Sequence, residues 1–121
     1  MKTILLVEDD PFISDIYSSR LREEDFTVDI AKDGQMALEK IKDNYYDLVV
    51  LDILLPKMDG WQVLKALRSE EKTKNLKVVV ISNLDQQDYA QEIADFGVIK
   101  YFLKIKTTPE EITNTVKEIL K

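Results

Sequence analysis

The sequence predicts an α/β fold: a doubly wound, five-stranded parallel sheet in the strand order 2-1-3-4-5, with helices on both faces. Two observations lead to this prediction. Five short apolar runs alternate along the chain with stretches of helical spacing, which is the pattern of repeated strand–helix units. Three of the runs are continuous, as in strands covered on both faces. The second and fifth contain polar residues and so suit the edges of the sheet.

The positions of the individual strands and helices follow from the apolar runs and from the stretches of helical spacing. We expect strands in the apolar runs, at residues 4–7, 28–31, 48–51, 78–81 and 99–103. We expect helices over the apolar stripes, at residues 13–21, 37–41, 63–67, 90–94 and 112–120. Asp10 before Pro11 and Thr108 before Pro109 are residue types that begin helices. The charged run 68–77 is interpreted as a solvated helix end and loop without a function.

Composition narrows the class of protein. With 121 residues, 45% of them apolar and 33% charged, residues 1–121 suit a single globular domain. The net charge of −6 and the lack of basic clusters argue against binding to nucleic acid or to an anionic membrane. No stretch has the pattern of a membrane span or a signal peptide, so we expect a cytoplasmic location. Cysteine and histidine are absent, which excludes thiol chemistry and a histidine base.

Asp52 is the residue around which the candidate site is built. It follows four consecutive apolar residues and precedes a loop that contains Pro56 and Gly60. This pattern predicts a carboxylate at the carboxyl end of a buried strand, which is where parallel sheets bind ligands. Aspartate is also common in simple turns. The residues at the other strand ends favour a functional role.

In the predicted order, strands 1, 3, 4 and 5 are neighbours, so their carboxyl ends meet in one crevice. These ends carry Glu8 and Asp9, Asp52, Ser82 and Lys104. Three carboxylates placed together resist ionisation unless a cation lies among them, and Mg²⁺ (or Mn²⁺) suits a site that handles phosphate. Lys104 would offer a positive charge to phosphate oxygens, and Ser82 a hydroxyl. A carboxylate such as Asp52 can act as the nucleophile that forms an aspartyl-phosphate.

Together these features resemble the receiver domain of bacterial two-component response regulators, over essentially the whole chain. The resemblance is carried by the residues just named, by residues 55–60 with the sequence LPKMDG, and by Tyr101, three residues before Lys104. It implies a flavodoxin-like (βα)5 fold, no turnover of an external substrate, and a stand-alone, chemotaxis-regulator-like switch or relay. The phosphoryl group would come from a sensor histidine kinase or a histidine phosphotransfer protein.

The resemblance also implies a role for each site residue. Asp52 would be the phosphoacceptor. The ligands of Mg²⁺ would be the carboxylates of Glu8, Asp9 and Asp52 and the backbone carbonyl of Leu54. The phosphoryl group would contact Ser82 and Lys104. Ser82 and Tyr101 would switch the face formed by the fourth helix, the fifth strand and the fifth helix, where a partner would dock.

Four residues depart from what is common in that family. Ile105 follows the lysine, where proline with a cis bond is frequent, so the loop is either trans and differently shaped or strained. Asn83 follows the serine, where a small residue is usual, and could crowd the entry to the pocket. Leu54 and Leu84 lie two residues beyond the aspartate and the serine. Neither leucine can orient a hydrolytic water, so we expect slow self-dephosphorylation.

Three other classes of protein share parts of this pattern and are alternatives to a phosphorylated receiver. A phosphatase of the haloacid-dehalogenase type needs a second acid two residues after its nucleophile, where this chain has Leu54. A flavodoxin-like flavin carrier needs hydroxyls and backbone donors after the first strand, where residues 8–10 are all acidic. A degenerate receiver that binds partners without phosphorylation fits Asn83 and Ile105, although retention of every acidic residue argues against it.

Overall fold

The computed structural model describes all 121 residues and contains one five-stranded sheet. Its strands are β1 (Thr3–Val7), β2 (Thr27–Ala31), β3 (Leu48–Asp52), β4 (Lys77–Ser82) and β5 (Lys100–Leu103). They are all parallel and lie in the order β2-β1-β3-β4-β5. The prediction for the sheet is confirmed in strand number, direction and order, and the strand bounds lie within one residue of those expected.

Five helices cover the sheet, and two short 3₁₀ turns lie among them. The helices are α1 (Pro11–Glu23), α2 (Gly34–Asp43), α3 (Gly60–Ser69), α4 (Ala90–Asp95) and α5 (Pro109–Ile119); the turns are η1 (Gln86–Tyr89) and η2 (Lys104–Lys106). Asp10 and Thr108 cap α1 and α5 as predicted, because their side chains accept hydrogen bonds from backbone N–H groups of the first turn. None of the helices combines the length and the apolar character that crossing a bilayer requires.

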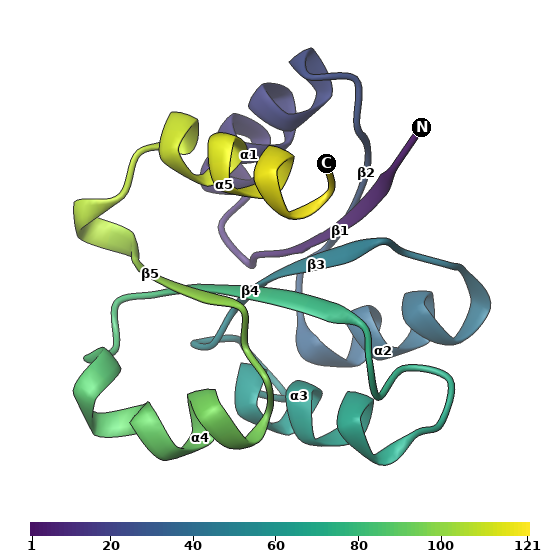
Figure 1. Cartoon of the computed structure of the whole chain (residues 1–121), viewed down its shortest axis with the longest axis vertical. Helices are drawn as coiled ribbons and strands as arrows, with labels where there is room; N and C mark the ends of the chain where they lie inside the picture. Colours follow the sequence, from purple (N-terminus) through teal and green to yellow (C-terminus); the bar gives the residue numbers. More distant parts are fainter.

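The helices form two layers, with α1 and α5 on one face of the sheet and α2, α3 and α4 on the other (Figure 1). Alternate residues of each strand point to opposite faces, so β1 sends Leu5 into one core and Leu6 into the other. Both residues are at most 1% exposed. The central strands are therefore held on both sides, which leaves the loops at their carboxyl ends as the surface where a site can form.

The interpretation of residues 68–77 as a solvated segment is wrong for Arg68. Its guanidinium donates hydrogen bonds to four backbone carbonyls, those of Phe96 (2.8 Å), Thr73 (3.2 Å), Lys74 (3.1 Å) and Leu76 (2.8 Å). Burial lowers the pKa of Arg68 from its ordinary value. Arg68 thereby joins the end of α3 to the segments that lead into β4 and β5. A run of charges in the sequence does not reveal this, because the four acceptors belong to the backbone.

Candidate functional site

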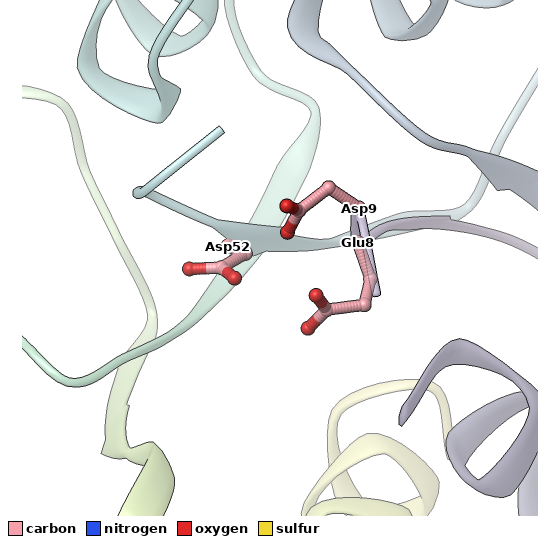
Figure 2. A group of neighbouring side chains, drawn as sticks. All are labelled: Glu8, Asp9 and Asp52. Atoms are coloured by element: carbon pink, nitrogen blue, oxygen red, sulfur yellow. The ribbon is translucent and has the colours of Figure 1, made fainter. Parts of the chain in front are cut away.

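The pairing of β1 with β3 brings the first two acidic groups together. Val7 lies level with Leu51, so Glu8, the first residue after β1, and Asp52, the last residue of β3, lie side by side. Figure 2 shows the carboxylates of Glu8, Asp9 and Asp52 around one common space, where an oxygen from each lies within 4.8 Å of the others. Glu8 is 2% exposed and Asp52 5%, whereas Asp9 is exposed. Negative charges this close and this buried require a compensating cation.

Lys104 supplies that cation from the end of β5. Its Nζ lies 2.7 Å from Oε1 of Glu8 and 2.8 Å from Oδ2 of Asp52. Burial alone would lower the pKa of Lys104, but the hydrogen bonds and charges of Asp52 and Glu8 outweigh burial and raise the pKa above its ordinary value. Burial raises the pKa of Glu8, and the hydrogen bond from Lys104 opposes that rise. The four predicted charged residues therefore form one connected cluster.

The oxygen atoms around this cluster fit a hard divalent cation. Asp9 is exposed and no protein group donates to its carboxylate, and the Leu54 carbonyl accepts no hydrogen bond from the protein. The other two acids are partly engaged, since Glu8 Oε2 accepts from the Asp10 N–H at 3.1 Å and Asp52 Oδ1 accepts from the Leu54 N–H at 3.2 Å. Carboxylates and a free backbone carbonyl are oxygen ligands of the kind that Mg²⁺ prefers.

The loop between β3 and α3 folds back tightly beside Asp52. Gly60 makes this approach feasible, since a Cβ there would lie 2.7 Å from the Asp52 carbonyl oxygen and 2.7 Å from the Ile53 Cα. Its N–H donates to the Ile53 carbonyl at 2.8 Å. Lys57 has a φ of 68°, in the left-handed region, which turns the chain within the loop. A side chain at position 60 would displace the backbone that carries Asp52.

Ser82 and Tyr101 are linked through one residue, Leu84. Ser82 is fully buried at the end of β4, and its Oγ accepts from the Leu84 N–H at 3.2 Å. The Tyr101 hydroxyl donates to the Leu84 carbonyl at 2.7 Å, with the side chain buried at 8% exposure. Burial raises the pKa of Tyr101 above its ordinary value. Both predicted switch residues therefore contact the same peptide segment after β4.

Trp61, the second residue of α3, contacts the segment that follows β4. Its indole ring stacks on Tyr89 in η1, with ring centroids 5.2 Å apart and an interplanar angle of 24°. The Trp61 Nε1 is buried without a hydrogen-bond partner. A movement of the segment that follows β4 would change the environment of the ring, so Trp61 fluorescence is a built-in probe of that segment.

Asn83 and Ile105 are separate departures from the family pattern in the sequence, but in the structure they are bonded to each other. The Ile105 N–H donates to the Asn83 side-chain carbonyl oxygen at 3.0 Å. The chain has no cis peptide bond, so the Lys104–Ile105 bond is trans. Of the two predicted loop shapes, the structure has the trans one. The partners lie 22 residues apart, and no local pattern could have paired them.

Comparison with known proteins places the chain in one family. Residues 4–117 match the response regulator receiver domain. The response regulator ArlR of Staphylococcus aureus is 30% identical over 121 residues, which cover 100% of this chain and 53% of ArlR. The chain thus spans about half the length of the curated relatives it matches.

Solved structures agree with the family match. A CheY-like receiver domain protein from Methanospirillum hungatei superposes with a TM-score of 0.90 at 27% identity, covering 99% of this chain and 94% of that one. The response regulator TrrA from Thermotoga maritima, solved in complex with Mg²⁺–BeF, has a TM-score of 0.83 at 31% identity and covers 98% of both chains. The chain therefore belongs to the family of response regulator receiver domains.

Proposed function

We propose that this receiver domain accepts a phosphoryl group on Asp52, with Mg²⁺ held by Glu8, Asp9, Asp52 and the Leu54 carbonyl. Receiver domains of response regulators are signalling modules that take phosphate from histidine kinases. The donor here would be a sensor histidine kinase or a histidine phosphotransfer protein, since the chain has no histidine. The observation that carries the proposal is the trio of carboxylates, two of them buried, with Lys104 bonded to both of the buried ones.

The chemistry is an in-line displacement at phosphorus. A carboxylate oxygen of Asp52 forms the new O–P bond while the P–N bond to the donor ring breaks. The other nitrogen of that ring already carries a proton, so the donor leaves as neutral imidazole. Lys104 carries the positive charge that offsets the phosphoryl oxygens, and the Ser82 hydroxyl donates to one of them. Bound Mg²⁺ would supply further charge neutralisation at the same oxygens. The domain thus promotes its own modification and turns over no external substrate.

The signal would pass from the phosphoryl group to a docking face through Leu84. If Ser82 Oγ turns to the phosphoryl group, it leaves the Leu84 N–H that it now accepts from. The Leu84 carbonyl holds the Tyr101 hydroxyl, so this rearrangement reaches β5 directly. We propose that the face formed by α4, β5 and α5 changes in this way and binds a downstream partner. Two hydrogen bonds in series, one on each side of Leu84, support this route.

The test is intact-mass measurement after incubation with acetyl phosphate, with and without Mg²⁺. We expect one phosphoryl group on the wild type only when Mg²⁺ is present, and none on Asp52→Asn. Asp59→Asn is the matched control, because Asp59 lies in the same loop but outside the acidic trio. An equal yield of adduct on Asp52→Asn would contradict the proposal. No adduct on the wild type, together with no response of Trp61 fluorescence to Mg²⁺, would favour the phosphorylation-independent interaction module.

A further inference from the structure

The two groups proposed to contact phosphate lie on Ser82, the last residue of β4, and on Lys104, the first residue after β5. The segments that follow these strands are joined beyond the end of the sheet. The pairing of β4 with β5 ends with Ser82 level with Leu103. One residue further on, the Asn83 side chain accepts the hydrogen bond from the Ile105 N–H. Each partner is adjacent in sequence to a proposed phosphate-contacting residue, Ser82 or Lys104. The link therefore continues the connection between the strands past the last backbone pair.

This link depends on both residue types at once. A proline at position 105 would have no N–H to donate, and a glycine or alanine at position 83 would have no acceptor. The residue before a proline is also kept out of helical conformations, whereas Lys104 begins the 3₁₀ turn η2. Asn83 and Ile105 therefore provide a trans loop whose position is set by a hydrogen bond to the neighbouring loop.

We propose that Asn83 is a positioning residue for phosphoryl transfer, acting through its hydrogen bond to the Ile105 N–H. The inference rests on the proposed function and deepens it. The Lys104 ammonium is attracted by Glu8 and Asp52, but its backbone needs a separate restraint, and the bond at Ile105 supplies one. It fixes the spacing between Ser82 and Lys104, across which the phosphoryl oxygens must fit. Small errors in such a spacing reduce rates strongly.

Crowding is the competing role for Asn83, and side-chain size separates the two roles. Asn83→Leu keeps a similar bulk but removes the acceptor, whereas Asn83→Ala removes both. If the hydrogen bond matters, the two variants behave alike. If bulk matters, Asn83→Leu behaves like the wild type and Asn83→Ala is faster. Asn83 is exposed, so neither substitution opens a cavity in the core.

The experiment measures the phosphorylation rate against acetyl phosphate concentration in Mg²⁺ buffer. We expect both Asn83 variants to lower the maximal rate about 3- to 10-fold, the range that one neutral hydrogen bond corresponds to, with an unchanged half-saturating concentration. The control Ile105→Ala trims an exposed side chain but keeps the N–H, and its rate should stay within about twofold of wild type. A wild-type maximal rate in Asn83→Leu would overturn the proposal.

Amide hydrogen exchange of Ile105 gives a second measurement that does not depend on phosphorylation. Loss of the acceptor should accelerate exchange at this N–H in Asn83→Leu and leave the amides within β5 unchanged. Unchanged exchange at Ile105 would overturn the positioning role even if the rates fell. If the wild type accepted no phosphoryl group at all, the proposed function would fail, and with it any role of Asn83 in transfer. Accelerated exchange would then establish the loop link alone.

Discussion

A half-buried cation lies at each end of the parallel strands, and the two cations are bonded in opposite ways. At the amino-terminal ends of the strands, here called the amino edge, Arg68 donates to four neutral backbone carbonyls. At the carboxyl-terminal ends of the strands, here called the carboxyl edge, Lys104 contacts two carboxylates, those of Glu8 and Asp52. A neutral carbonyl keeps its character through any reaction of the domain. A carboxylate that accepts a phosphoryl group does not, so only the second cation has partners whose charge would change.

This difference separates groups that stabilise the fold from groups that would carry the chemistry. The amide carbonyls around Arg68 have no alternative role, and their hydrogen bonds hold three segments together. The carboxylates around Lys104 repel one another, and burial makes that repulsion stronger. The carboxyl edge therefore retains a locally unfavourable arrangement, compensated by Lys104 and by the apolar cores on both faces of the sheet. Substitutions at the two edges should accordingly have different readouts.

The largest effect is expected from Lys104→Met at the carboxyl edge. Loss of a charged donor aimed at the transferring group should slow phosphoryl transfer to Asp52 about 10²- to 10³-fold. A time course of intact mass with acetyl phosphate measures this. Lys106→Met is the control, since Lys106 is exposed in the same loop and has no ion-pair partner. A rate close to wild type in Lys104→Met would contradict the proposed role of Lys104 in phosphoryl transfer.

Arg68→Met should lower the stability of the fold and leave the phosphorylation rate nearly unchanged. Removing a charged donor from four carbonyls should lower the free energy of unfolding by about 2–3 kcal/mol, because hydrogen bonds to charged groups contribute roughly that much. Urea unfolding gives this value, and Lys65→Met on the exposed face of α3 serves as the control. The phosphorylation rate of the folded protein should stay within about twofold of wild type. A large loss of rate at unchanged stability would show that the amino edge takes part in transfer.

Leu54 lies two residues beyond Asp52, and its side chain is 55% exposed. An apolar side chain cannot orient a water for attack on phospho-Asp52, so we expect a phosphoryl half-life much longer than seconds. Leu54→Gln should shorten that half-life at least about 10-fold, since a positioned polar group can assist the water. Decay of the adduct after donor removal measures it. Ile99→Gln, at an exposed apolar residue of the amino edge, should change nothing. A wild-type half-life of seconds would refute the expectation.

The smallest effect is expected from Tyr46→Phe at the amino edge. The Tyr46 hydroxyl donates to Asp29 Oδ2 at 2.7 Å, and the loss should cost about 1 kcal/mol at neutral pH because Asp29 remains partly hydrated. Burial, followed by this hydrogen bond, raises the pKa of Tyr46 above its ordinary value of 10.0. The stabilisation is therefore complete below pH 10.0 and is lost as the pH rises toward the raised pKa.

Urea unfolding at a series of pH values checks this expectation. The difference in unfolding free energy between wild type and Tyr46→Phe should shrink above pH 10.0, since the folded wild type must then give up a buried proton. A difference that stays constant through the alkaline range would mean that Tyr46 ionises as easily in the folded protein as in the unfolded chain.

The fold and the charged cluster were predictable because each depends on short patterns and on strand order. Continuous apolar runs identify β1, β3 and β4, and the order of the strands then brings Asp52 and Lys104 to one edge. The roles of Arg68, Tyr46 and Asn83 were not predictable. Arg68 and Asn83 are bonded to backbone groups, which every residue carries, and their partners depend on how loops of different strands approach one another. Polar residues whose partners are backbone atoms leave no pairing signal in one sequence.

The pairing of β1 with β3 has a consequence for how the chain folds. The acidic trio is complete within the first 52 residues, but its cation arrives only at residue 104. A chain that emerges from the ribosome in sequence order can form β1, β2 and β3 before Lys104 exists. In such a partly folded species the three carboxylates meet without the charge of Lys104, which raises its free energy. The same charges that we propose to prepare Asp52 for phosphate therefore favour closing the sheet as a whole, with β4 and β5 already in place.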